Sequence, residues 1–391
     1  MRVLFITHNY PRYEGDPVGS FVLRLAVSLR AEGIEVHVVA PAAPDVPPTG
    51  VIEGIPVTRF RYAPRRLETL AYTGTMGAQV RQFWKARLAM VGFLGAGYRA
   101  VMRVNRDFAA DVIHAHWWFP GGLVARVVAS RTGTPYIVTM HGSDVRLAAG
   151  APGAGSLFRA VSRRASVMTT VSTWLAAQAS RLDPAMRPEV APMPVVADLF
   201  HAERDRDPSR LLFVGKLTEQ KGLQHLLRAM ARMRARAHLD VVGAGRVEDG
   251  HLRALAQELG VADRITWKPM LTQAELAVCY RTATIHVMPA IDEGLGLTAV
   301  ESLLSETPVV AFDSGGVTDV VRPGQTGVLV PAGDVPALAE ALDRLLDNPG
   351  ERARLGAEGR AFALRQFGPA AVASRYAALL RAAQRGQGAG R

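Results

Sequence analysis

Two glutamates, Glu293 and Glu301, stand eight positions apart around a glycine-broken turn in the sequence DEGLGLTAVES. A short apolar strand predicted over 284–289 runs into this turn, and the turn opens a helix predicted over 297–304. The first amides of a helix lack intrahelical partners and lie at the positive end of its dipole, so they favour a phosphate. One carboxylate can reach past such a phosphate while the other reaches a ribose hydroxyl. The spacing therefore predicts a site for a phosphorylated ligand, although a capping Glu293 and a solvated Glu301 remain the alternative.

Lysine is rare in this chain, and two of its four lysines lie together at the end of another predicted strand. They are Lys216 and Lys221, in the segment VGKLTEQKG, and they stand out against a total of 46 lysines and arginines. A lysine ammonium is a compact point charge that suits a phosphate group. We therefore expect both side chains to neutralise a phosphate, with chance surface positions as the alternative.

The composition limits the class of protein. A chain of 391 residues exceeds one comfortable hydrophobic core, so two domains are expected. The single cysteine, Cys279, excludes an intramolecular disulfide and a metal site with several cysteines. The start of the sequence lacks the pattern of a signal peptide, and the longest apolar stretch, 88–98, is shorter than the ~20 residues needed to cross a bilayer. We expect a cytoplasmic protein.

The net charge of +11 lies mostly in the first 200 residues, which carry +9. Arginines and a lysine alternate with large apolar residues over 59–106. Such a segment could lie on an anionic membrane at the inner face, where a lipid-linked acceptor would be found. Ordinary solvated helices in an arginine-rich chain explain the same pattern. Nucleic-acid binding is not expected, because no nucleic-acid motif accompanies the charge.

Short apolar runs alternate with amphipathic segments along the chain, which is typical of parallel sheets covered by helices. Four prolines crowd the span 182–196, where we place a hinge. The predicted domains are therefore residues 1–190 and 191–366, followed by a segment 367–391 that contains a helix packing back on the first domain and a flexible tail. The strands predicted in the first half are 3–7, 35–40, 112–115, 136–140 and 167–171.

Several of these segments occur together, in order, in one known family. The segments are RVLFITHNYP with VGSF, DVIHAH, VTMHGSD, VSTWL, LLFVGKLTEQKG, VVGAG, DEGLGLTAVESL and FDSGGVTDVV. Together they resemble the retaining glycosyltransferases of family 4, whose E-x7-E signature the two glutamates match. The resemblance covers nearly the whole chain. It implies an α/β protein of the GT-B architecture, in which two Rossmann-like domains face one another across a cleft.

The resemblance implies that a hexose is moved, without metal and with retention of anomeric configuration, from a nucleoside-diphosphate sugar to a hydroxyl of a glycan, lipid-linked or small-molecule acceptor. UDP or GDP is the expected nucleotide, and no cofactor is expected. The first domain would hold the acceptor and the second the donor. The implied catalytic residues are Lys216, Lys221, Glu293 and His141. The implied donor-binding residues are Gly19, Gly215, Leu295, Gly296, Leu297, Thr298 and Glu301, and Asp144 and His116 are assigned to the acceptor side.

The chain departs from the family pattern at several of these positions. Lys216 stands where an arginine is usual, and Gly19 is followed by Ser20 where relatives often have a second glycine. Lys268 and Pro269 replace a glycine near the nucleobase. Asp144 could instead cap the following helix. The alternatives to a transferase are a nucleotide-sugar epimerase of similar shape and a non-catalytic two-lobed sugar-binding protein.

Overall fold

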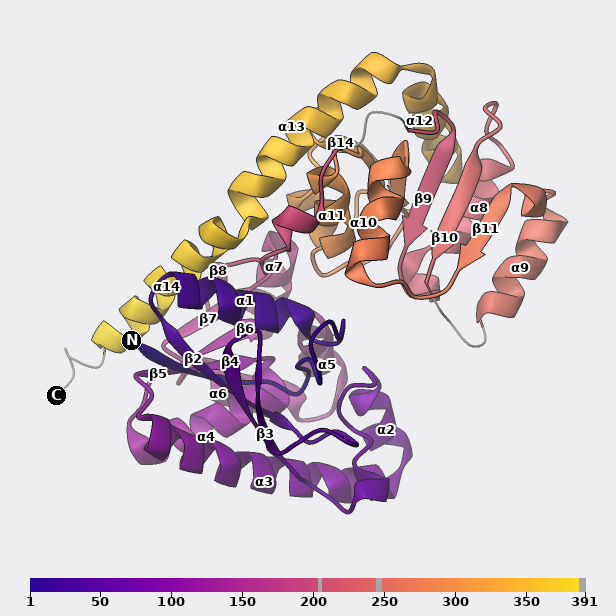
Figure 1. Cartoon of the computed structure of the whole chain (residues 1–391). Coiled ribbons are helices and arrows are strands. Elements are labelled where there is room, and N and C mark those ends of the chain that lie inside the picture. Colours follow the sequence, from indigo (N-terminus) through magenta and orange to yellow (C-terminus); the bar gives the residue numbers. More distant parts are fainter. Residues whose placement is uncertain (203–205, 244–247, 387–391) are drawn as a thin grey trace. The chain divides into compact units, whose positions relative to one another are not determined.

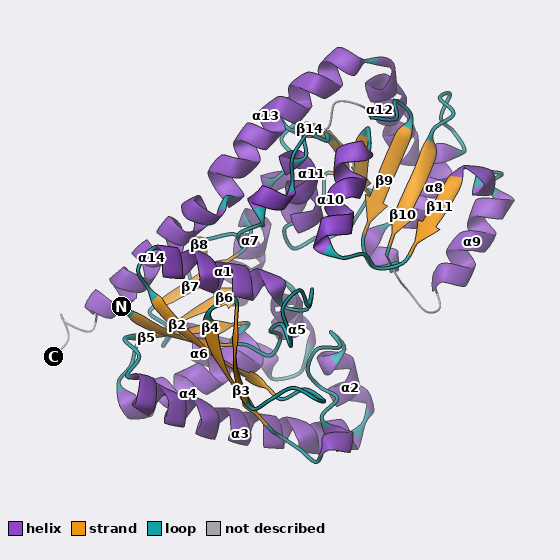
Figure 2. Cartoon of the chain, in the orientation of Figure 1, coloured by secondary structure: helices purple, strands orange, loops and turns teal. Residues whose placement is uncertain are grey.

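The computed structural model describes residues 1–202, 206–243 and 248–386, and the chain divides into two compact units (Figure 1). The first unit combines Met1–Pro194 with the C-terminal segment that begins at Val372, and the second unit is Val195–Ala371. The tail after residue 386, for which the sequence predicts flexibility, lies outside the described residues. Each unit is built around its own sheet, with helices on both of its faces (Figure 2).

The sheet of the first unit has the strand order β3-β4-β2-β1-β5-β6-β7-β8, and it is parallel except for the β3-β4 pair. The five strands predicted in the first half are confirmed. The β3-β4 hairpin and the two-residue β8 were not predicted, because β3 is largely exposed and β8 is too short to show a pattern. The strands are β1 Arg2–Ile6, β2 Glu35–Pro41, β3 Thr49–Ile52, β4 Ile55–Phe60, β5 Val112–His116, β6 Tyr136–Met140, β7 Val167–Thr170 and β8 Glu189–Val190.

Eight helices of the described residues belong to this first unit. They are α1 Ser20–Ala31, α2 Met76–Gln82, α3 Trp84–Phe108, α4 Leu123–Thr132, α5 Ser143–Gly150, α6 Ala154–Ser162, α7 Thr173–Leu182 and α14 Pro369–Gly386. The terminal helix α14 packs on the first sheet: Tyr376 donates a hydrogen bond to the Ala191 carbonyl at 2.8 Å, and its ring stacks on His114. Within the described residues, no helix has both the length and the apolar character that crossing a membrane requires.

The sheet of the second unit is entirely parallel, with the order β11-β10-β9-β12-β13-β14. The order reverses between β9 and β12, and such a switch point is where doubly wound sheets bind ligands, beyond the carboxyl ends of the strands. The strands are β9 Arg210–Val214, β10 His238–Val242, β11 Ile265–Lys268, β12 Ile285–Met288, β13 Val309–Phe312 and β14 Gly327–Val330. The helices are α8 Leu223–Met230, α9 Glu248–Glu258, α10 Gln273–Thr282, α11 Leu297–Leu304, α12 Val335–Asp347 and α13 Pro349–Phe367.

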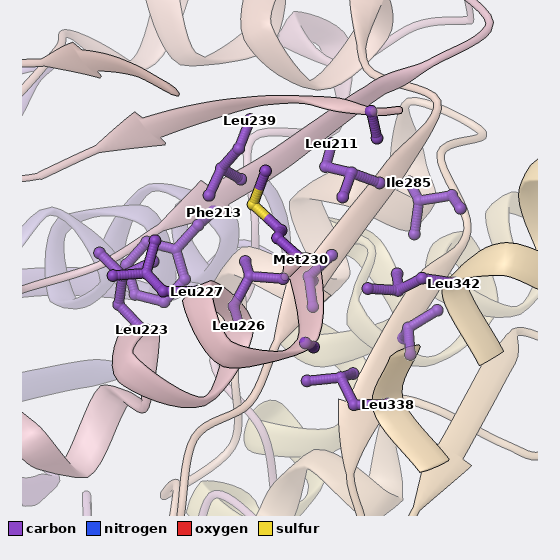
Figure 3. Close-up of a cluster of buried hydrophobic side chains, with 14 of the residues drawn as sticks. Leu211, Phe213, Leu223, Leu226, Leu227, Met230, Leu239, Ile285, Leu338 and Leu342 are labelled. Atoms are coloured by element: carbon purple, nitrogen blue, oxygen red, sulfur yellow. The ribbon is translucent and has the colours of Figure 1, made fainter. Parts of the chain in front are cut away.

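A buried apolar cluster fixes the start of β9 and the helix that follows its loop (Figure 3). Helix α8 turns leucines and a methionine at helical spacing toward the strands, because their positions i, i+3, i+4 and i+7 share one face. The cluster includes Leu211, Phe213, Leu223, Leu226, Leu227, Met230, Leu239, Ile285, Leu338 and Leu342. Both ends of the lysine-bearing loop between β9 and α8 are thereby anchored in the core.

Candidate active site

The lysine loop and the glutamate loop meet at the switch point of the second sheet. Lys221 closes the loop after β9, and Glu293 lies in the loop after β12, the strand that neighbours β9. The Lys221 Nζ forms an ion pair with the Glu293 Oε2. The two side chains are 28% and 15% exposed, so the pair is reachable from solvent but largely enclosed. Two of the predicted catalytic residues are thus brought together.

Backbone contacts hold these two loops against each other. The Ile291 amide donates to the Gln220 carbonyl at 2.9 Å, and the Gln220 side-chain amide donates to the Asp292 carbonyl at 3.0 Å. Gly222 has φ 74, and a Cβ at this position would collide with the carbonyl oxygen of Pro289. Only glycine allows this approach, because any other side chain would push the loops apart. The position of Lys221 beside Glu293 therefore depends on Gly222, which the sequence did not single out.

A third loop, after β13, supports the Glu293 backbone from another direction. The Gly316 amide donates to the Glu293 carbonyl at 2.7 Å, and the Asp292 amide donates to the Ser314 hydroxyl at 3.0 Å. Gly315 forms a single parallel bridge with Glu293, at φ 72. The segment FDSGG, which served above only as a landmark of the family, thus has a physical role: it fixes the main chain that carries the glutamate.

The helix predicted over 297–304 is confirmed as α11, and it begins beside Glu293. Gly296 caps it at φ 88 without a side-chain hydrogen bond, and the first internal bond runs from the Ala299 amide to the Gly296 carbonyl at 2.9 Å. The amides of Leu297 and Thr298 have no acceptor among the described residues, so they present donors at the positive end of the helix. Leu295, which precedes Gly296, has its side chain buried in the second unit.

Glu301 lies one turn inside α11 and is buried, with 9% of the residue exposed. Its Oε2 accepts a hydrogen bond from the Tyr280 hydroxyl of α10 at 2.9 Å. Burial raises the pKa of Glu301 to about 7, against the opposing effect of hydrogen bonds from Tyr280 and Gln273. The alternative that Glu301 is a solvated surface residue is therefore wrong. Its environment depends on α10, which the sequence did not connect with it.

The remaining candidates of the lysine loop have different surroundings. Lys216 is exposed, and within the described part of the chain its ammonium has no ion pair. Gly215 donates its amide to the Val242 carbonyl at 3.0 Å and packs against Gly243, whose Cβ would collide with the Gly215 carbonyl. Gly243, the first glycine of the segment VVGAG, therefore serves packing, and Gly245 of the same segment lies outside the described residues.

In the first unit, His116 and His141 lie at the carboxyl ends of the neighbouring strands β5 and β6. The His116 Nδ1 and the His141 Nε2 are 3.2 Å apart, and the two rings are stacked. His116 is fully buried, whereas His141 is partly exposed. Desolvation, reinforced by neighbouring histidines, holds the pKa of both rings well below the ordinary value. Both imidazoles are therefore neutral at neutral pH.

Asp144 ties the loops after β5 and β6 together. Its Oδ1 accepts the amides of His141 and Gly142 at 3.1 and 3.0 Å, and its Oδ2 accepts the Trp118 amide at 3.2 Å. The Trp118 indole returns a hydrogen bond to the Asp144 carbonyl at 2.6 Å. Asp144 is 2% exposed, and burial raises its pKa although the three amides act in the opposite direction. Both carboxylate oxygens are thus engaged in holding backbone.

Two aromatic residues beside His141 were not anticipated from the sequence. Trp117, at φ 64, places its ring 4.4 Å from His141 and 4.2 Å from His8, between ring centroids. Phe21, in the first turn of α1, lies 5.1 Å from His141. Gly19 caps that helix at φ 71 with the Asn9 backbone against it. An aromatic residue directly after the strand that carries His116 is the signal that could have identified Trp117.

Two family models together match almost the whole chain. The model described as "Glycosyl transferase 4-like domain" matches residues 18–195, and the model "Glycosyl transferases group 1" matches residues 198–362. The boundary between them falls at the boundary of the two structural units.

Curated relatives carry the names of glycosyltransferases. A D-inositol 3-phosphate glycosyltransferase of Acidothermus cellulolyticus is 36% identical over 65% of this chain and 63% of its own length. An MMP alpha-(1->4)-mannosyltransferase of Mycolicibacterium hassiacum is 32% identical over 80% of this chain and 78% of its own length.

Solved structures share the architecture at lower sequence identity. Sucrose-phosphate synthase from Thermosynechococcus elongatus has a TM-score of 0.80 at 23% identity, with 97% of this chain and 98% of that chain covered. Anabaena HepE in complex with UDP-glucose has a TM-score of 0.73 at 16% identity, with 97% and 99% covered. The expected fold is confirmed, and of the classes left open by the sequence the transferase is the one that applies. The chain belongs to the group 1 family of glycosyl transferases, and it is a glycosyltransferase of the GT-B fold with two Rossmann-like units.

Proposed function

We propose that this protein is a retaining, metal-independent glycosyltransferase that moves a hexose from a nucleoside-diphosphate sugar to an acceptor hydroxyl. The observation that carries the proposal is the Lys221–Glu293 pair beside the amides at the start of α11, which have no acceptor in the described part of the chain, at the switch point of the second sheet. A cation from one loop, and a carboxylate and helix amides from the neighbouring loop, suit a diphosphate joined to a polyol.

Lys221 is proposed to neutralise the diphosphate as it leaves. An ammonium has three donors, and Glu293 engages one of them, which leaves the others for phosphate oxygens. Glu293 would thereby orient Lys221, while its carboxylate accepts hydrogen bonds from hydroxyls of the sugar. The amides of Leu297 and Thr298 add donors that need no rearrangement, which is how a preorganised site stabilises developing negative charge. Lys216, exposed at the other end of the loop, is proposed as a second cation for the same diphosphate.

Glu301 is proposed to bind the ribose of the donor. Its burial makes the ionised form costly, and hydroxyls that donate to the carboxylate would favour ionisation again. Binding of the nucleotide would then lower the pKa of Glu301. The buried Tyr280 hydroxyl fixes one carboxylate oxygen and so sets the direction of the other.

The transfer itself is proposed to use the departing phosphate as the base. The bond between the anomeric carbon and the phosphate oxygen breaks, the acceptor oxygen bonds to that carbon from the same face, and the hydroxyl proton passes to the phosphate. This scheme balances without a side-chain nucleophile. It requires stabilisation of an oxocarbenium-like centre and of a leaving diphosphate, and the groups around Lys221 serve the second need.

In the first unit, His141 is proposed to contact the donor sugar, and Gly19 to let the β1–α1 loop approach the diphosphate. Because both Asp144 oxygens accept backbone amides, its proposed role is to hold the His141 loop. The HepE complex with UDP-glucose favours UDP as the nucleotide. The names of the relatives favour a small polyol or sugar acceptor.

Contact with an anionic membrane in the cytoplasm belongs to the same proposal, and the first two turns of α3 support it. Trp84, Leu88 and Val91 stand at helical spacing on one face and are 63–70% exposed, with Phe83 beside them at 52%. The sequence contains no acidic residue between positions 68 and 107 and six basic ones. Aromatic and aliphatic side chains flanked by cations are the composition of an interfacial helix.

Co-sedimentation with phosphatidylglycerol vesicles tests this surface. The Trp84→Ser, Leu88→Ser double variant is expected to lose binding, because two apolar anchors are removed. Met270→Ser, which removes a similarly exposed apolar side chain from the second unit, is the matched control. Equal binding by the double variant and the wild type would remove the membrane from the proposal.

The transferase proposal is tested by incubating the purified protein with UDP-, GDP- and ADP-sugars and measuring release of the nucleoside diphosphate with and without polyol and sugar acceptors. One donor is expected to support transfer, with slow hydrolysis when acceptor is omitted. Product stereochemistry by NMR reports retention, and activity in a chelator reports metal independence. Failure of every donor both to bind and to react would overturn the proposal.

A further inference from the structure

The hydrogen bond between His116 and His141 contains a single proton whose position decides what His141 can do. The His116 Nδ1 lies 3.2 Å from the His141 Nε2. A neutral imidazole has one N–H and one bare nitrogen, so one ring must donate and the other accept. The direction of this bond therefore fixes the tautomer of both rings.

The surroundings of His116 determine that direction. Its second nitrogen, Nε2, is buried and has no hydrogen-bond partner among the described residues. If the proton were on Nε2, the protein would bury an N–H donor without an acceptor, which is rarer in native structures than an unpaired acceptor. The rings of His114 and Phe5 lie against His116 with centroids 4.4 and 5.0 Å away, and neither ring offers this nitrogen a hydrogen-bond partner.

The environment of His141 fits the same assignment. Asp144 holds its main-chain amide, and the Trp117 and Phe21 rings lie against its side chain. With Nε2 occupied by His116, the nitrogen left for a ligand is Nδ1, for which the described residues supply no partner. His141 is partly exposed, whereas His116 is fully buried.

We propose that His116 is a positioning residue: it donates its Nδ1–H to the His141 Nε2 and holds His141 in the tautomer that carries its proton on Nδ1. His141 then acts on the donor sugar as an uncharged hydrogen-bond donor and not as a base. The inference rests on the proposed function for the contact between His141 and the sugar. It deepens that function, because His116 then positions His141 and does not bind the acceptor.

Two substitutions at position 116 distinguish the effect of the donated hydrogen bond from the effect of side-chain packing. In His116→Asn the side-chain amide nitrogen is the same number of bonds from the main chain as Nδ1 and can still donate. In His116→Leu the volume is kept and the donor is lost. The free energy of one buried hydrogen bond corresponds to a change in rate of about 10-fold to 100-fold. The kcat of the leucine variant is therefore expected to fall by that factor. The asparagine variant is expected to recover most of the loss, with little change in KM for the acceptor.

The tautomer itself can be observed in protein with 15N-labelled histidines, by NMR of the ring nitrogens without any sugar nucleotide. The His141 signals are assigned by their disappearance in His141→Gln. We expect a protonated Nδ1 and a bare Nε2 for His141, retained in His116→Asn and lost to a mixture of tautomers in His116→Leu. A proton on the His141 Nε2 in the wild type, or equal kcat in the leucine and asparagine variants, would overturn the proposal.

The tautomer of His141 and the transferase function can be tested separately. The NMR measurement needs no substrate, so it decides the tautomer even for a protein that transfers no sugar. Absence of transfer with every donor overturns the proposed function, whereas transfer combined with the opposite tautomer overturns only the role of His116. Should His116→Leu not fold, the wild-type spectrum still decides the question.

Discussion

The two units place their candidate residues at equivalent positions, beyond the carboxyl ends of parallel strands, and surround them in opposite ways. In the second unit, a charged pair, Lys221 and Glu293, remains partly exposed beside helix amides that have no acceptor among the described residues. In the first unit, neutral histidines are packed between aromatic rings. The nearby carboxylate of Asp144 accepts hydrogen bonds from backbone amides.

This difference suits the two kinds of ligand chemistry in the proposed function. A diphosphate is bound by cations and by the positive end of a helix, and these groups must remain available to an incoming anion. A sugar ring is uncharged and is bound by directed hydrogen bonds and by contact with aromatic surfaces. Loops at the carboxyl ends of parallel strands thus hold charged side chains in one unit and neutral side chains in the other, and the sequences of those loops make the difference.

The largest effect is expected from Lys221→Ala. It removes the cation that we propose to face the leaving diphosphate, and loss of one such preorganised group typically lowers kcat by about 100-fold to 1000-fold. Steady-state kinetics with the preferred donor measure this. Arg236→Ala is the matched control, because Arg236 forms an exposed ion pair with Asp263 at 3.0 Å in the same unit, away from the proposed site. Equal losses in the two variants would contradict a specific role for Lys221.

Asp144→Ala is expected to reduce stability and transfer together. Three buried amides lose their acceptor, so the free energy of unfolding should fall by about 4 kcal/mol, measured by urea denaturation. Asp343→Ala is the control, since Asp343 is also buried and accepts the amides of Arg234 and Ala235. It should lose stability but keep transfer by the folded fraction. A fully active Asp144→Ala protein would refute the link between this carboxylate and His141.

The raised pKa of Glu301 predicts that the stability of the folded protein depends on pH. Its pKa rises from an ordinary 4.5 to about 7 on folding, so the folded state binds more protons between these values. The free energy of unfolding therefore decreases as pH rises through this window, by up to ~3 kcal/mol from this group. Glu301→Gln should remove this contribution in denaturation at several pH values. In Tyr280→Phe the pKa of folded Glu301 should rise further, because the hydrogen bond from Tyr280 lowers it. The decrease in stability should then continue to a higher pH. An unchanged pH profile in Glu301→Gln would rule the coupling out.

The smallest expected difference in stability separates backbone strain from contact between the loops. Gly222→Ala introduces both an unfavourable positive φ and a collision with the Pro289 carbonyl, whereas Gly260→Ala, at φ 65, meets no neighbouring atom. The strain alone costs about 1 kcal/mol. We expect Gly222→Ala to lose ~2 kcal/mol more than Gly260→Ala in thermal denaturation, and to lose transfer as well. Equal stability of the two variants would show that the loops do not depend on this contact.

The sequence could predict features that are local. The glycine-broken turn before a helix placed α11 correctly, and apolar runs placed the five main strands of the first sheet. It could not predict that Glu301 is buried, because its burial depends on Tyr280 from another helix.

Nor could the sequence show how Gly222 packs against Pro289, because that contact joins two loops that are 67 positions apart in the sequence. Asp144 was ambiguous for a related reason: one spacing fits both a cap and a ligand contact, and only the position of Trp118 decides how its oxygens are used.

Amide hydrogen exchange with and without UDP or GDP tests the contrast between the two units most directly. We expect the nucleotide to slow exchange most strongly in the segments 215–222 and 291–300 of the second unit. The segment 141–146 should respond less until the sugar is attached. Unchanged exchange in both second-unit segments, with protection concentrated in the histidine loops instead, would contradict the assignment of the diphosphate to Lys221 and the start of α11.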